Sequence, residues 1–216
     1  MAIAVGYNVS KAKEVMDDVS KHYSKLGEII QTGWDEVTNT LQTNWIGTDE
    51  QKSEDAIAKR ICTLYVNTAE LANSCVTTIA GLTNSWIEFQ KTNGFEGDGG
   101  ASLANVEAPK ISAVSDIVKK KERTFNESED MGLKDESSAT TIKSSIEGYV
   151  NEVKSQVKNL FDSIDVGAAF FGEQTQVIKT YVEKVGTAIG EVSVAIRDMY
   201  EKIDEIAGTQ YTQTAT

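Results

Sequence analysis

Two long runs of regularly spaced apolar residues, on either side of Trp45-Ile46-Gly47, restrict this chain to helical architectures. Within each run, apolar side chains recur at steps of three, four and seven residues, the spacing of one face of an α-helix. The single proline of the chain leaves little to interrupt a long helix. The pattern predicts amphipathic helices over about residues 8–43 and 49–92. The apolar positions are Val15, Val19, Tyr23, Leu26, Ile30, Val37 and Leu41, then Ile57, Ile61, Leu64, Ala72, Val76, Ile79, Leu82, Trp86 and Phe89.

The stretch Trp45-Ile46-Gly47 is predicted to form the turn between these two helices. Gly47 can adopt the backbone conformations of a tight turn without steric cost. Thr48 followed by Gln51 fits a capping box, in which a hydroxyl and an amide satisfy main-chain N–H groups at a helix start. The large side chain of Trp45 at this turn either covers the helix ends or forms a contact surface.

A linker is predicted between this first hairpin and the rest of the chain. Residues 93–100 read Asn-Gly-Phe-Glu-Gly-Asp-Gly-Gly, which is typical of a flexible break, and their acids lack the regular ligand spacing of a calcium loop. After Pro109, four apolar residues on one helical face predict a shorter amphipathic helix, and a polar stretch as far as Ser138 follows it. These four residues are Ile111, Val114, Val118 and Phe125.

The second half of the chain repeats the organisation of the first. Two further amphipathic runs flank an aromatic turn at Phe170-Phe171-Gly172, where Phe170 takes the place of Trp45. Each turn is followed shortly by an acid and a glutamine, Glu50-Gln51 and Glu173-Gln174. The apolar positions are Ile142, Ile146, Tyr149, Val153, Val157, Leu160 and Ile164, then Ile178, Tyr181, Val185, Ala188, Val192, Ala195, Met199, Ile203 and Ile206.

Two hairpins with one apolar stripe per helix can bury those stripes only against each other. The sequence therefore predicts an all-α fold, a four-helix bundle made of two antiparallel helical hairpins with an extra linker helix. The expected boundaries are residues 1–93 for the first hairpin, 94–138 for the linker, and 139–216 for the second hairpin and its polar tail.

Charge and functional groups argue against several classes of protein. A formal net charge of −12 disfavours a nucleic-acid partner, and the basic run Lys119-Lys120-Lys121 is interpreted as a solvated helix face. The single histidine, His22, cannot by itself supply a metal cluster or a catalytic triad. Cys62 and Cys75 are about 20 Å apart along one predicted helix, beyond disulfide reach. We expect no enzymatic activity, no catalytic residue, no metal site and no cofactor.

Membrane insertion and a cleavable leader are also not expected from the sequence. The apolar start, Met1 to Tyr7, lacks the charged lead and the length of a signal-peptide core. No apolar run approaches the roughly 20 residues that cross a bilayer. We therefore expect no stable membrane insertion.

The hairpin with Trp45-x-Gly47 in its turn resembles the WXG family, small ESAT-like proteins exported by type VII secretion systems. Members of this family pair as two antiparallel hairpins, and this chain resembles two such units fused. The family also carries an export signal, Tyr-x-x-x-Asp/Glu, near the end of the last helix. Tyr200 and Asp204 match that pattern in that place. As a simpler alternative, they are neighbours on one face of a helix.

The resemblance implies a non-enzymatic protein that is a substrate or helper of a type VII machine and is secreted without a signal peptide. The membrane ATPase of that machine would be its partner, reading Tyr200, Asp204 and the Trp45 turn, and another WXG-type protein is a second candidate. Because the pair is already fused, we expect a monomer or a weak homodimer. The alternative function is a structural or adaptor bundle that binds another helical protein through an exposed apolar stripe.

The antiparallel arrangement also predicts the course of the linker. The first hairpin would end far from its own turn, and the second would have to begin beside that turn. The chain must then travel the length of a ~40-residue helix, about 60 Å. We expect the piece from Ile111 to Phe125 to pack lengthwise in a groove, and Tyr200 to lie next to Trp45.

Overall fold

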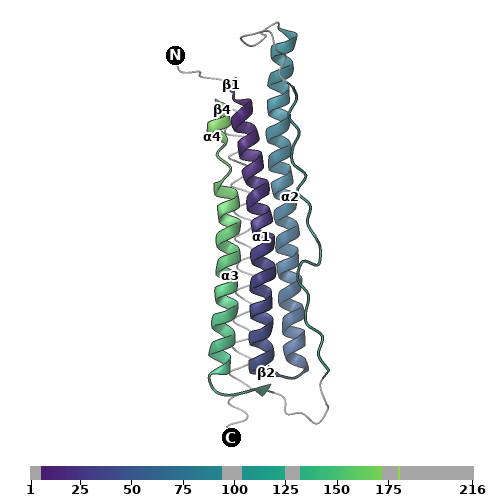
Figure 1. The fold of residues 1–216 in the computed structure, drawn as a ribbon, viewed down its shortest axis with the longest axis vertical. Helices are drawn as coiled ribbons and strands as arrows, with labels where there is room; N and C mark the ends of the chain where they lie inside the picture. Colours follow the sequence, from purple (N-terminus) through teal and green to yellow (C-terminus); the bar gives the residue numbers. More distant parts are fainter. Residues whose placement is uncertain (1–5, 94–103, 125–131, 172–179, 181–216) are drawn as a thin grey trace. The chain divides into compact units, whose positions relative to one another are not determined.

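The computed structural model describes residues 6–93, 104–124, 132–171 and 180. The regular structure of these residues is almost entirely helical, so the all-α prediction is confirmed. The first two helices begin and end within about one residue of the limits that the apolar periodicity predicts. The described helices are α1 (Val9–Asn44), α2 (Thr48–Thr92), α3 (Ser138–Asp162) and the one-turn α4 (Val166–Ala169), as Figure 1 shows.

The apolar stripes of α1 and α3 are buried, as their periodicity predicts. Every stripe residue named above for these two helices is less than a tenth exposed, from Val15 to Leu41 in α1 and from Ile142 to Leu160 in α3. Stripes of this kind stabilise long helices mainly through the apolar surface that they remove from water. Gly27 and Gly33 lie in α1 and carry no side chain. Tyr65 therefore approaches the helix backbone closely at Gly27, and Tyr149 does so at Gly33.

The C-terminal part of α2 departs from the predicted stripe. The periodicity places Leu82, Trp86 and Phe89 in the core, but the buried positions there are Thr83 and Ile87, and Phe89 is 54% exposed. The hydroxyl of Thr83 donates to the main-chain oxygen of its own helix one turn earlier, at 2.8 Å, so its burial leaves the hydroxyl satisfied.

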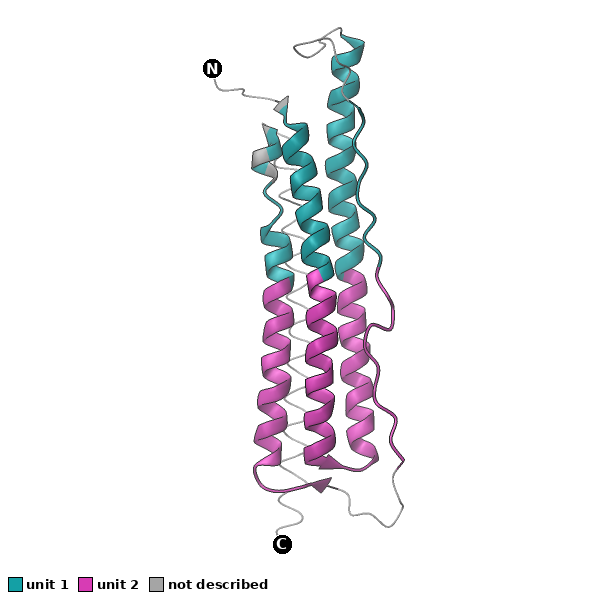
Figure 2. Ribbon diagram, in the orientation of Figure 1, with its two compact units in different colours: residues 1–24, 68–112, 157–187 teal, residues 25–67, 113–156, 188–216 magenta. Residues whose placement is uncertain are grey.

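The chain divides into two compact units, and each of them contains part of every long helix (Figure 2). Unit 1 comprises residues 1–24, 68–112 and 157–187, and unit 2 comprises residues 25–67, 113–156 and 188–216. Aromatic packing is prominent in both. In unit 1 the rings of Tyr7 and Trp86 stack at 5.8 Å, and in unit 2 the rings of Trp34 and Tyr149 are 6.4 Å apart.

Four two-residue strands form two short antiparallel pairs. In unit 1, β1 (Gly6–Tyr7) pairs with β4 (Phe170–Phe171), so that Tyr7 lies opposite Phe170. In unit 2, β3 (Gly132–Leu133) pairs with β2 (Trp45–Ile46), so that Leu133 lies opposite Trp45. In each pair, the strand that precedes a long helix, β1 before α1 and β3 before α3, pairs with a strand that begins with an aromatic residue.

The two strand pairs have the same register. In both, a glycine, Gly6 or Gly132, lies opposite the second residue of the partner strand. The residue after that glycine, Tyr7 or Leu133, lies opposite the aromatic residue that begins the partner strand. A further main-chain hydrogen bond occupies the same place in each, from Asn8 N to Ala169 O at 2.7 Å and from Lys134 N to Asn44 O at 3.0 Å. The internal repeat therefore extends beyond the turns to the segments Gly6-Tyr7 and Gly132-Leu133, whose similarity sequence inspection missed.

The prediction of a linker helix is wrong, because the described linker residues, 104–124, form no helix. Residues 104–124, which we call the strap, are extended with a turn at Ser115-Asp116, and they run along α2 within each unit. The expected apolar face does not form, because Ile111 and Val118 are buried while Val114 is 58% exposed. Side chains of α2 occupy main-chain groups of the strap that a helix would need for its own hydrogen bonds. The prediction that this piece packs lengthwise is correct.

Candidate functional site

The turn between α1 and α2 is built around a buried tryptophan. Trp45 is only 1% exposed and belongs to the core, whereas its neighbour Ile46 is 38% exposed. Gly47 has a φ of 130°, a conformation that side-chain-bearing residues rarely adopt. The Trp45-x-Gly47 pattern thus has a local physical cause: an indole that closes the core and a glycine that turns the chain.

Asn44 connects this turn to the start of α3. Its side-chain nitrogen donates to the main-chain oxygen of Thr40 at 2.8 Å, and its side-chain oxygen accepts from the Ser138 hydroxyl at 3.3 Å. Its main-chain oxygen accepts from Lys134 N, next to the β2–β3 pair. One residue therefore holds together the end of α1, the strand pair and the first residue of α3.

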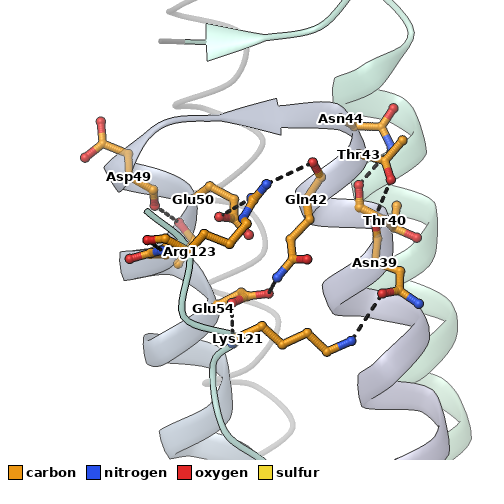
Figure 3. A network of polar contacts seen from close by, with 12 residues as sticks. Asn39, Thr40, Gln42, Thr43, Asn44, Asp49, Glu50, Glu54, Lys121 and Arg123 are labelled. Carbon is orange, nitrogen blue, oxygen red and sulfur yellow. Dashed lines mark hydrogen bonds and ion pairs between the residues drawn. The ribbon is translucent and has the colours of Figure 1, made fainter. Parts of the chain in front are cut away.

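Two carboxylates lie in the core beside this turn (Figure 3). Glu50 and Glu54, one turn apart on α2, are both fully buried. Arg123 of the strap reaches in from the side: its Nη2 lies 2.5 Å from Glu50 Oε2, and its Nη1 donates to Gln42 O at 3.2 Å. One guanidinium thus joins the buried Glu50 of α2 to the main chain of α1.

Glu54 holds the strap through its main chain. Its Oε2 accepts the N–H of Lys121 at 2.9 Å, and its Oε1 accepts from Gln42 Nε2 at 3.3 Å. Gln51 also binds the strap, because its Nε2 donates to the main-chain oxygen of Arg123 at 2.7 Å. The amide of Gln51, which the capping-box pattern assigned to the helix start, therefore binds the strap instead.

Burial controls the protonation of this acid pair. It raises the pKa of Glu50, which the Arg123 guanidinium opposes, and it raises the pKa of Glu54, where the Lys121 N–H opposes it and the nearby charge of Glu50 adds to it. Within the described residues, Glu50 Oε1 also has no hydrogen-bond donor, which favours uptake of a proton by the pair. The two carboxyls therefore form a coupled pair, and burial raises the pKa of both.

The groups around this acid pair serve to attach the strap. Its polar contacts join α1, α2 and the strap, and the described part of the chain contains no group of three or more His, Cys, Asp or Glu side chains that could hold a metal ion. The geometry supports a mechanical role, in which Arg123 and the Lys121 main chain fasten the strap beside the Trp45 turn.

A groove of about 880 Å³ lies between α2 and the strap in unit 2. Lys119 and Lys120 of the basic run line it. The run Lys119-Lys120-Lys121 is not helical, so the interpretation of this run as a helix face is wrong. Three lysines line the groove, and each is paired with an acid that also lines it, so the charges of the lining balance. The pairs are Lys59 with Asp55 at 2.6 Å, Lys119 with Asp116 at 2.5 Å, and Lys120 with Glu122 at 3.3 Å.

The strand Phe170–Phe171 is similar to the strand Trp45–Ile46 where it is described. Phe170 is 1% exposed, like Trp45, and its strand pairs with Gly6-Tyr7. The hydroxyl of Tyr7 donates to Gln90 Oε1 at 3.0 Å, which joins this strand pair to α2. Gly172 of the second turn motif, and Tyr200 and Asp204 of the export-signal pattern, lie outside the described residues.

Sequence reasoning missed the acid pair, although a signal for half of it was present. Glu50 and Glu54 precede Ile57 and Ile61 at steps of four, three and four, so they continue the apolar stripe of α2 into its first turns. Acids at core positions indicate a buried partner. Nothing in the sequence pointed to Arg123 as that partner, because it lies 73 residues from Glu50.

Comparison of the chain with protein-family models, with curated proteins and with solved structures finds no match. Among the described residues, no helix is both long enough and apolar enough to cross a membrane.

Proposed function

We propose that this protein is a non-enzymatic substrate or helper of a type VII secretion machine, in which two WXG-like hairpins are fused in one chain. The observation that carries the proposal is the repeated junction at the two aromatic turns. Trp45 and Phe170 are both buried, and each lies in a short strand that pairs in the same register with the segment leading into a long helix. Equivalent junctions are what two similar hairpins packed against each other would produce.

In this proposal the chain is a four-helix bundle of two antiparallel hairpins. The first hairpin is α1 and α2, and the second is α3 with the apolar run from Ile178 to Ile206. Each strand pair brings the start of one hairpin to the turn of the other, as antiparallel packing requires. The extended strap supports the same arrangement, because it runs back along α2.

Recognition by the secretion ATPase would then use groups other than the buried indole. Trp45 has a structural role, and the exposed residue of its turn is Ile46. We assign the export signal to Tyr200 and Asp204, which have the spacing of the family pattern. The proposed partner is the membrane ATPase, and export is signal-peptide-independent.

An export assay in a type VII-competent strain tests this proposal. Tyr200→Ala should abolish appearance of the chain in the medium while its amount and helicity in the cell stay unchanged. Tyr211→Ala is the matched control, because it removes a nearby tyrosine with no acid four residues later. Equal export of both variants and the parent chain, or export that is independent of the machine, would contradict the proposal.

The fused arrangement makes a separate prediction about self-association. The complete chain should sediment as a monomer or a weak dimer, because its hairpins bury each other's apolar faces. A chain cut to residues 1–100 would expose the faces of α1 and α2 and should self-associate. A clean, stable monomer of residues 1–100 would speak against a fused pair.

A further inference from the structure

In unit 1, two asparagines of α2 bind the main chain of the strap in the same way. Asn84 Oδ1 accepts the N–H of Val106 at 2.7 Å, and its Nδ2 donates to the main-chain oxygen of the same residue at 2.9 Å. Asn73 repeats this arrangement with Ile111, whose N–H is 3.0 Å from Asn73 Oδ1 and whose oxygen accepts from Asn73 Nδ2. Each amide therefore satisfies both main-chain groups of one residue, as a neighbouring β-strand would.

The spacing of the two asparagines matches an extended chain. Asn73 and Asn84 are eleven residues apart, which corresponds to about 16.5 Å along an α-helix. Val106 and Ile111 are five residues apart, which corresponds to about 16.5 Å in an extended segment. The helix therefore offers amide groups at the repeat distance of five extended residues.

The same spacing occurs in the other half of α2. Gln51, Cys62, Asn73 and Asn84 stand eleven residues apart in turn. In unit 2, Gln51 Nε2 donates to a strap carbonyl at 2.7 Å and the Cys62 thiol to another at 3.4 Å. Eleven residues make three helical turns at about 3.67 residues per turn, so side chains at this spacing lie along one line of the helix surface.

The asparagines specify little about the sequence that they bind. Their hydrogen bonds to the strap reach only main-chain groups. The strap residues that they bind, Val106 and Ile111, bury their side chains. Pro109 lies between them, where no main-chain N–H is required, and Glu107 and Lys110 are exposed. The requirement is therefore an extended segment with β-branched apolar residues five positions apart.

We propose that the Asn73–Asn84 face of α2 is a binding site for an extended peptide segment, and that it accepts the strap of a second copy of this chain when its own strap is displaced. Residues 104–112 are its occupant within one chain. The strap of another copy is chemically identical and satisfies the same four hydrogen bonds and the same two apolar contacts. It competes with a tethered segment at high effective concentration, so exchange requires that the internal strap be unseated first. This inference is independent of the proposed secretion function.

Complementation between two full-length variants tests the proposal. Val106→Asp with Ile111→Asp gives a chain whose strap cannot seat but whose asparagine face is intact. Asn73→Ala with Asn84→Ala gives a chain with an intact strap and no amides to hold it. Each variant alone should sediment as a monomer, and an equimolar mixture should form a heterodimer. A mixture that remains monomeric while both chains keep their helical circular dichroism would overturn the proposal.

A peptide experiment measures the site directly. A synthetic peptide of residues 104–112, added to the first variant, should cause saturable shifts of the side-chain amide resonances of Asn73 and Asn84. The same peptide with N-methyl groups at Val106 and Ile111 should bind about tenfold more weakly for each hydrogen bond lost. If the double aspartate variant loses helicity, the milder Val106→Ser, Ile111→Ser chain replaces it. Absence of amide shifts, or equal binding of both peptides, would overturn the assignment.

Discussion

Gly33 of α1 lies directly against the ring of Tyr149 in α3, so closely that a Cβ at Gly33 would stand 2.5 Å from Tyr149 Cδ2. Tyr149 is itself held in place, because its hydroxyl donates to the main-chain oxygen of Ile30 at 3.1 Å and its ring packs near Trp34. The glycine that weakens α1 as an isolated helix is therefore what allows α3 to approach it in unit 2.

Gly33→Ala should destabilise the protein although alanine favours a helix. The added methyl group must displace a buried ring, which costs about 1–3 kcal/mol and exceeds the roughly 1 kcal/mol gained in helix propensity. Gly148→Ala is the matched control, because a Cβ there meets nothing within 4 Å. Urea unfolding should show a lower midpoint for Gly33→Ala and a higher one for Gly148→Ala. Stabilisation by both changes would refute the close approach.

Trp45→Ala should lower the free energy of unfolding by about 3–5 kcal/mol, because it empties a fully buried site at the first turn. Trp45→Phe should cost less, since Phe170 takes the equivalent place in the other strand pair with the same 1% exposure. Thermal unfolding followed by circular dichroism distinguishes the two variants. Little change in melting temperature for Trp45→Ala would show that the indole does not close the core.

Glu54→Gln should change how stability depends on pH. Since burial raises the pKa of Glu54 above its ordinary 4.5, the folded chain binds this proton more readily than the unfolded chain does. The resulting stability is fully present below about pH 4.5 and is lost as pH rises through the raised pKa. Relative to Glu54→Gln, the parent chain should therefore lose stability as pH rises from about 4 toward neutrality.

Urea midpoints of the parent chain and the variant, measured at about pH 4 and at neutral pH, give this difference. Glu122→Gln is the control, because Glu122 is an exposed strap acid paired with Lys120. It should follow the pH dependence of the parent chain. If Glu54→Gln shows the same pH dependence as that control, the buried acid pair does not take up a proton in this range.

Arg123→Met should destabilise the chain by about 3 kcal/mol, because it leaves Glu50 buried without its guanidinium. Changing both partners, Glu50→Met with Arg123→Met, should restore most of that loss, since an apolar pair needs no counter-charge. A double-mutant cycle from urea unfolding measures the coupling. A double variant less stable than Arg123→Met alone would argue against the ion pair as the reason for the loss.

Sequence by itself determined the elements whose cause is local. The limits of α1 and α2, the buried stripe of α3 and the turn at Gly47 all follow from residue spacing and backbone preference within a few neighbouring residues. Those signals depend on the helix period and on glycine, neither of which needs a distant partner. The close packing at Gly33 depends instead on a distant partner, the ring of Tyr149.

Only the tertiary structure decided the strap, the acid pair and the role of Trp45. The stripe Ile111, Val114 and Val118 has helical spacing, but asparagines of α2 take the main-chain groups of the strap and hold it extended. Glu50 and Arg123 form an ion pair although they are 73 residues apart in the sequence, so neither residue by itself predicts the pair. These features depend on which segments meet, and the free energy of burying a polar group is set by the partner that it finds there.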